Sequence, residues 1–108
     1  LGSSVNGGGI LSTFNPDGKM TSVVGGGESG GGFIRTYNSD GKASAYFGTG
    51  EGGSGQIKTY NALGVETVFL GTDNNDAGLV GVNNNSGRLR AFIGIDEIGN
   101  GLLETTEK

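Results

Sequence analysis

The sequence contains no cysteine and no histidine, and these two absences restrict the chemistry that the chain can carry. Without cysteine no disulfide can form, so folding does not depend on the redox state of the compartment. Histidine is the commonest general base and the commonest metal ligand, so its absence weighs against an enzyme. We therefore expect no catalytic residues and no cofactor.

Basic residues are also few. The 7 lysines and arginines are outnumbered by 11 aspartates and glutamates, which gives a formal net charge of -4. Nucleic acids and anionic membranes bind basic surfaces, so neither is an expected partner. No apolar run approaches the ~18 residues of a transmembrane helix, and the opening "LGSS" lacks the pattern of a signal peptide. We expect no membrane insertion.

Glycine, by contrast, is abundant, with 25 residues. Glycine loses more backbone freedom on folding than any other residue, so a chain this rich in glycine needs much compensating burial. The large apolar side chains are modest in number for that purpose. This balance favours a chain that gains further burial from neighbours, either identical chains or additional repeats of itself.

A turn recurs at a fixed interval along the whole chain. The stretches "NPDG", "NSDG", "NALG" and "NNSG" begin at residues 15, 38, 61 and 84, an interval of 23 residues. The repeated turn positions are Asn15, Asn38, Asn61 and Asn84, and Gly18, Gly41, Gly64 and Gly87. We interpret residues 1–108 as a single repeat domain, a segment of a longer fibre, with units of about 9–31, 32–54, 55–77 and 78–100 and partial units at both ends.

Each unit predicts two short strands. In the second unit, residues 33–37 and 42–47 alternate in character and are rich in β-branched and aromatic residues. Asparagine first and glycine fourth match a type I turn followed by a left-handed glycine. The other connection, "GTGEGGSG", is longer, and we expect it to wrap a corner rather than close a tight hairpin. No window has a helical period, so the predicted class is all-β.

Equivalent positions define the predicted core. Two columns are apolar in every copy, namely Leu11, Ile34, Ile57, Val80 and Leu103, and Val24, Phe47, Leu70 and Ile93. A third column, Ser22, Ala45, Val68 and Ala91, stays small. The aromatic columns Phe14, Tyr37 and Tyr60, and Tyr46, Phe69 and Phe92, fall on the opposite side of the strands. We expect these aromatic residues to pack between chains.

Two architectures fit this pattern. One chain coiling 23 residues per turn would form a monomeric β-solenoid with two sheet edges to protect. Three identical chains around a common axis would instead turn each apolar column into a threefold layer. We favour the homotrimer and keep the monomeric solenoid as the alternative.

The succession of short strand, glycine-bearing turn, short strand and glycine-rich link resembles the shaft repeats of trimeric viral fibres. These include the triple β-spiral of adenovirus and reovirus fibres and the triple-stranded β-helix or β-prism of bacteriophage tail fibres. The stalks of trimeric bacterial adhesins look similar. The shared motif is the turn glycine with apolar residues alternating on either side of it. The resemblance implies a repetitive fibrous β-structure with a mechanical role, outside the cell, on a virion tail or a cell surface.

Binding chemistry is sparse. Glu28, Glu51 and Glu97 recur in the glycine-rich link and favour a solvated corner over a calcium site. In the acidic loop "GTDNNDAG", Asp73 and Asp76 are weak candidates for a metal site. The column of Thr13, Thr36, Thr59 and Thr105 would suit an ice-binding face, but Val82 interrupts it. The tyrosines Tyr37, Tyr46 and Tyr60 could stack on a glycan.

The sequence thus predicts a structural, non-enzymatic shaft segment of a homotrimeric fibre. Such a segment holds a receptor-binding or adhesive tip away from its anchor. Its partners are identical chains and neighbouring fibre domains, with a cell-surface glycan or receptor bound through another region. The alternative function is a binding module, in which a monomeric β-solenoid presents a glycan, cation or ice-binding face.

Overall fold

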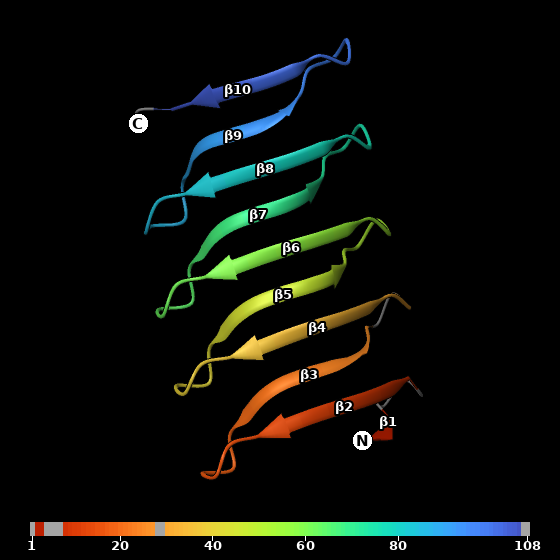
Figure 1. Cartoon of the computed structure of the whole chain (residues 1–108), viewed down its shortest axis with the longest axis vertical. Helices are drawn as coiled ribbons and strands as arrows, with labels where there is room; N and C mark the ends of the chain where they lie inside the picture. Colours follow the sequence, from red (N-terminus) through yellow and green to blue (C-terminus); the bar gives the residue numbers. More distant parts are fainter. Residues whose placement is uncertain (1, 4–7, 28–29, 107–108) are drawn as a thin grey trace.

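The computed structural model describes residues 2–3, 8–27 and 30–106. They form ten strands in one antiparallel sheet, in the order of the chain (Figure 1). The strands are β1 Gly2–Ser3, β2 Gly9–Phe14, β3 Met20–Gly26, β4 Gly32–Tyr37, β5 Ala43–Thr49, β6 Gly55–Tyr60, β7 Glu66–Thr72, β8 Gly78–Asn83, β9 Leu89–Ile95 and β10 Gly101–Thr105. No helix occurs in these three ranges, so the all-β prediction is confirmed.

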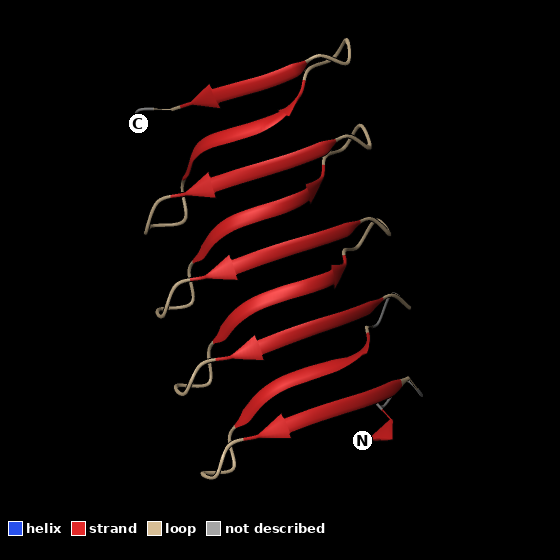
Figure 2. Ribbon diagram, in the orientation of Figure 1, coloured by secondary structure: helices blue, strands red, loops and turns tan. Residues whose placement is uncertain are grey.

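The repeat unit is one hairpin. Strands β2, β4, β6, β8 and β10 begin at residues 9, 32, 55, 78 and 101, so the 23-residue interval spans a strand, a turn, a second strand and a second turn. Every strand pairs antiparallel with the strands before and after it in the chain. The result is a single-layer sheet with extents of 47 × 28 × 15 Å, and no other element of the described residues packs over either face (Figure 2).

This pairing differs from the alternative that the sequence left open. A β-solenoid stacks equivalent strands of successive coils directly on one another. Here equivalent strands, such as β4 and β6, are separated by an antiparallel strand that hydrogen-bonds to both. The repeat closes as a hairpin before it can complete a coil, so the monomeric β-solenoid is wrong for this chain.

The predicted turns lie along one edge of the sheet. In the second of them, the Gly41 amide donates to the Asn38 carbonyl at 3.0 Å, and the Asn38 side chain accepts from the amides of Asp40 and Lys42. The fourth position requires a left-handed backbone, and φ is 85° at Gly41. The same position has φ of 82°, 89° and 84° in the other copies, at Gly18, Gly64 and Gly87.

The turns along the other edge were expected to be loose corners, and this expectation was wrong. The Gly50 amide donates to the Ser54 carbonyl at 2.8 Å, and the Gly53 amide donates to the Gly50 carbonyl at 3.0 Å. With φ of 91° at Gly53, this is the geometry of the first turn set. A left-handed residue at the fourth position closes a tight hairpin here too, because extra glycines next to it do not lengthen the loop.

A β-bulge follows each turn of the first set. The register shifts between Thr36 and Tyr37, so that Ser44 becomes an extra residue on β5, and the other hairpins repeat this shift. The extra residue is left unpaired, and beyond it Ala45 lies opposite Thr36 and Phe47 lies opposite Ile34. The side chains of β2 to β10 therefore keep constant faces along the sheet.

The predicted core is not buried within the single chain. Among the described residues, Val23 is the one buried apolar side chain, with 6% exposure. Phe47 is 61% exposed and Leu103 is 70% exposed, although both belong to the predicted core columns. The columns do share one face, but a single layer has no second layer to cover that face.

Candidate functional site

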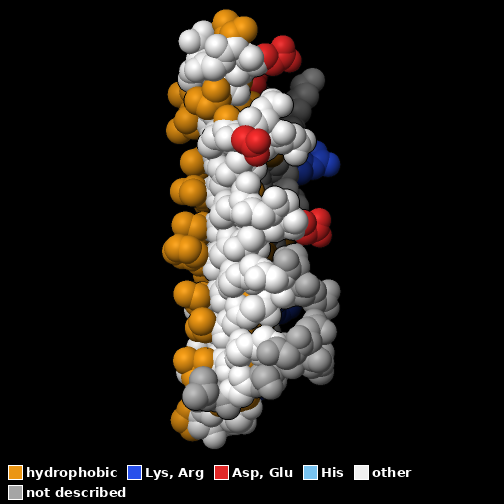
Figure 3. Space-filling view, turned by 90° about the vertical axis from the view of Figure 1, so that its right-hand side faces the viewer, with side chains coloured by type: hydrophobic (Ala, Val, Ile, Leu, Met, Phe, Trp, Pro, Cys, Tyr) orange, Lys and Arg blue, Asp and Glu red, His pale blue; other side chains and the backbone are white. Residues whose placement is uncertain are grey.

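The two predicted core columns form one continuous line across the sheet, which we call the apolar row. Cross-strand pairing runs without interruption from β2 to β10, with one residue of the row on each strand. The apolar row consists of Leu11, Val24, Ile34, Phe47, Ile57, Leu70, Val80, Ile93 and Leu103. Viewed edge-on, hydrophobic side chains line one side of the sheet from end to end (Figure 3).

Small residues flank the apolar row on the same face. We call one of these neighbouring rows the glycine flank. It lies two residues from the apolar row on each strand, on the side of the glycine-rich turns. It contains Gly9, Gly26, Gly32, Thr49, Gly55, Thr72, Gly78, Ile95 and Gly101, and Ile95 is its one large member. Two positions in the other direction lies the hydroxyl flank, which contains Thr13, Ser22, Thr36, Ala45, Thr59, Val68, Val82, Ala91 and Thr105.

None of these three rows contains a charged residue. Sequence reasoning identified the apolar row and the small column of the hydroxyl flank. It missed that the recurring glycines at 9, 32, 55, 78 and 101 share the face of the apolar row. The signal was available, because each of these glycines stands two residues before a member of the apolar row.

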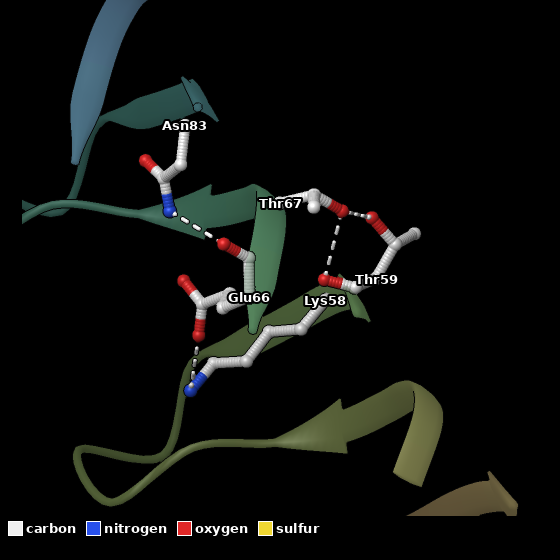
Figure 4. Close-up of polar contacts among 5 residues, drawn as sticks. All are labelled: Lys58, Thr59, Glu66, Thr67 and Asn83. Carbon is white, nitrogen blue, oxygen red and sulfur yellow. Dashed lines mark hydrogen bonds and ion pairs between the residues drawn. The ribbon is translucent and has the colours of Figure 1, made fainter. Parts of the chain in front are cut away.

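Four of the five hydroxyl groups in the hydroxyl flank, those of Thr13, Ser22, Thr36 and Thr59, have partners within the chain. Thr36 and Ser44 hydroxyls lie 2.6 Å apart, and Thr59 and Thr67 hydroxyls lie 2.7 Å apart. Figure 4 shows the latter pair, in which the Thr67 hydroxyl also donates to the Thr59 carbonyl at 3.2 Å. Burying a polar group is costly mainly when it loses its hydrogen bonds. This face can therefore be covered without leaving these hydroxyls unsatisfied.

The opposite face is charged and aromatic. The rings of Phe33 and Tyr46 stack with centroids 5.8 Å apart, and the Arg35 guanidinium lies over both rings, 5.6 Å and 5.4 Å from their centroids. Lys58 pairs with Glu66 at 3.4 Å (Figure 4). Both partners are about one-third exposed or less, at 27% and 33%, so this ion pair is partly screened by solvent.

Glycines let these aromatic side chains lie flat. A Cβ atom at Gly48 would fall 2.6 Å from the Phe33 Cα atom on the neighbouring strand, and a Cβ atom at Gly71 would fall 2.8 Å from the Phe69 ring. The aromatic columns lie opposite the apolar row, as predicted. Within the chain, Tyr46 lies against Arg35, and Phe69 lies against Lys58 and Gly71. Packing of the aromatic columns between chains stays a prediction.

A hollow of about 700 Å³ opens on this second face between the turns. Phe33, Arg35, Tyr46, Lys58 and Tyr60 line it. Two of the three tyrosines proposed for glycan stacking, Tyr46 and Tyr60, thus have neighbours that could bind a polar ligand, whereas Tyr37 does not line the hollow. Arg35 already occupies a face of the Tyr46 ring, however, and the Tyr46 hydroxyl donates to the Thr49 carbonyl at 2.8 Å.

The weak metal candidates occupy turn positions. The Asp73 carboxylate accepts from the amides of Asn75 and Ala77 at 2.8 Å and 3.0 Å, which is the role of asparagine in the other turn set. Asp76 takes the left-handed fourth position, with φ of 65°. In the described part of the chain no three potential ligands cluster around a metal position. Glu51 and Glu97 are exposed in equivalent turns, and Glu28 lies outside the described residues.

No protein-family model and no curated protein matches the chain. The proposed function is therefore argued from the geometry of the sheet. No helix that is long and apolar enough to cross a membrane is found in the described residues. The feature that stands out is the face made by the apolar row and its two flanks.

Proposed function

We propose that this chain is a structural, non-enzymatic shaft segment of a homotrimeric fibre. The observation that carries the proposal is the apolar row. Its large side chains are 36% to 70% exposed, except that of Val80, which is half-buried. Isolated exposed apolar residues are common on proteins, but a contiguous line across nine strands marks an interaction surface. The function follows from covering that surface with further copies of the same chain.

Identical chains are the occupants that the face suits best. It carries no charge, so a copy of itself brings no like-charge repulsion and no unpaired ion. Its length of 47 Å and a strand length of ~20 Å give a face of about 1,000 Å² per chain. Stable interfaces bury ~800 Å² per partner, so this face is large enough to hold an assembly together.

A shaft is the role that the repeat supports. Each hairpin adds two strands at ~4.8 Å spacing, which lengthens the sheet by ~10 Å along one direction. Its mechanical function is to set the distance between the tip of the fibre and its anchor. Backbone hydrogen bonds along the fibre and apolar packing across it provide the stiffness.

The setting of the fibre rests on the resemblance to viral fibres and adhesin stalks. We propose an extracellular location, on a virion tail or cell surface, with neighbouring fibre domains at the ends. A receptor or cell-surface glycan would be bound through another region. Because every strand pairs within its own chain, the arrangement favours a β-prism over a spiral or interwound helix, whose strands pair between chains.

The test is the mass of the chain in solution, measured by light scattering over a hundredfold range of concentration. We expect a constant mass of three chains and a cooperative thermal transition. A constant mass of one chain that still melts cooperatively would overturn the proposal, because the apolar row would then be stable in water.

A further inference from the structure

We infer that three copies stand side by side as the walls of a triangular prism, each chain forming one complete wall. The apolar row faces the axis, and the flanks meet at the corners, the glycine flank of one chain against the hydroxyl flank of the next. This inference rests on the proposed function and specifies the partner surface, namely a second copy in the same orientation.

The sizes of the side chains across the face match a three-walled prism. Strands of six or seven residues make a wall ~22 Å wide, whose centre lies ~6 Å from the axis of an equilateral prism. Large side chains such as Phe47 and Leu70 fill that distance. Two residues away, the gap to the adjoining wall has narrowed to ~4 Å, which suits Gly55 or a short side chain such as Ala45.

A two-layer sandwich would require a different pattern. Facing sheets lie ~10 Å apart over their whole width, so inward positions in all three rows would need large side chains. Glycines at Gly32, Gly55 and Gly78 would leave an unfilled channel along one side of such a sandwich. The large centre and small margins therefore favour three walls over two.

The flatness of the sheet also favours a straight prism wall. Adjacent strands normally rotate by ~20–25°, so ten strands would ordinarily turn through about half a circle. Here the strands keep nearly one direction in Figure 1, and the apolar side of the sheet is almost straight in Figure 3. A flat face lets the apolar row follow a straight axis for its full length, which a strongly twisted sheet could not do.

The chemistry of the two flanks allows them to meet at the corners. A corner covers the hydroxyl flank, and its threonines keep the hydroxyl partners described above, such as Thr36 with Ser44. The glycine flank presents bare backbone, and most of its glycines have open space at the Cβ position, as at Gly9, Gly55 and Gly78. Side chains of a neighbouring wall can use that space without a clash.

The experiment uses engineered cysteines, which are unambiguous because the chain has none. The first variant carries Ala45→Cys and Thr49→Cys, one in each flank of β5. The second carries Thr59→Cys and Thr49→Cys, which lie on neighbouring strands. This pair is included because the strands are inclined to the long axis, so the two ends of one strand lie at different heights (Figure 1). Within one chain these pairs lie ~13 Å apart, beyond the ~7 Å limit for a disulfide.

Mild oxidation of at least one double variant should produce a covalently closed trimer on a non-reducing gel, in more than half of the chains. The single variants Thr49→Cys and Ala45→Cys are controls and should stay uncrosslinked, because each flank meets the other flank and not itself. The mass of each reduced variant is measured first. If substitution prevents assembly, the equivalent pair on β7, Val68→Cys with Thr72→Cys, replaces it.

The outcomes separate the two proposals. A mass of three chains without covalent trimers in any double variant would overturn the prism and leave the trimeric shaft standing. A mass of two chains with covalent dimers would overturn both, in favour of a sandwich. A single variant that crosslinks efficiently to itself would also overturn the prism, because it would place like flanks together.

Discussion

The two faces of this sheet use the same strands but stabilise the chain in different ways. On the aromatic face, Arg35, Phe33 and Tyr46 cover one another, and Gly48 leaves room for the close approach of the Phe33 backbone on the neighbouring strand. On the other face, Phe47 and its neighbours stand on a flat surface with nothing over them. One face is partly covered by these stacked side chains of its own chain, and the other is left for partners. The difference is visible in the sequence, because charged residues occur on the aromatic face and are missing from the apolar row.

The largest effect should come from breaking the face that is left for partners. Phe47→Asp would place three carboxylates around one axial level, where each loses hydration without gaining a partner. We expect light scattering to show loss of the trimer and calorimetry to show no cooperative transition. Leu63→Asp is the matched control, because Leu63 is 77% exposed in a turn, and it should leave the mass unchanged. Equal behaviour of the two variants would remove the distinction between the faces.

A bulky residue in the glycine flank should have the next largest effect. A Cβ atom at Gly55 would meet no atom within 4 Å in the single chain, so a side chain at this position starts in open space on an isolated wall. At a prism corner it would push two walls apart, and we expect at least a tenfold loss of trimer affinity by analytical ultracentrifugation. Gly52→Phe, in an exposed turn, is the control. Unchanged assembly of Gly55→Phe would contradict the corner contact.

The aromatic face can be tested by filling the space that its glycines keep open. Gly48→Ala would bring a methyl group within 2.6 Å of the Phe33 Cα atom and the Gly32 carbonyl oxygen, so backbone must move. We expect a loss of ~1–3 kcal/mol per chain, measured by denaturant unfolding, with the trimer mass retained. Gly52→Ala, with open space at its Cβ position, should change stability little. A neutral Gly48→Ala would mean that this face is not closely packed.

The turns join the strands that carry the two faces, and Gly41→Val tests the left-handed position that closes one of these turns. The position has φ of 85° and open space around it, so the penalty comes from the backbone alone. A left-handed conformation costs an L-residue ~1–2 kcal/mol, and β-branching raises this cost. We expect a lower melting temperature with unchanged mass at low temperature. Gly52→Val is the comparison, because Gly52 is a turn glycine without positive φ. Equal melting temperatures for the two variants would contradict the turn assignment.

The smallest effect should come from Lys58→Met, which removes the ion pair with Glu66 but keeps the aliphatic stem. Exposed pairs of this kind contribute ~0.2–1 kcal/mol. We expect the free energy of unfolding, measured by chemical denaturation, to decrease by that amount at low salt. The decrease should be smaller at high salt. A loss as large as that of Phe47→Asp would mean that the charged face, and not the apolar row, holds the assembly.

Sequence patterns predicted the class, the strands and the first set of turns. Asparagine and glycine at fixed positions specify a turn locally, and alternation along Phe33 to Tyr37 specifies which side chains share a face. The second set of turns was misjudged because "GTGEGGSG" contains several glycines, and only the backbone conformation distinguishes Gly53, which is left-handed, from Gly52, which is not. The exposure of the core columns was missed for another reason. Local sequence specifies a face, whereas burial depends on what lies over that face.

An even number of strands per repeat has a consequence for how such a gene can change. Loss or gain of one 23-residue unit removes or adds a whole hairpin, so the strands on either side of the junction still run in the correct directions. The apolar row continues across the junction on the same side, because the bulge and both turns belong to the unit. Unequal recombination between neighbouring repeats therefore yields shorter or longer proteins that fold by the same rules, and selection can act on length alone.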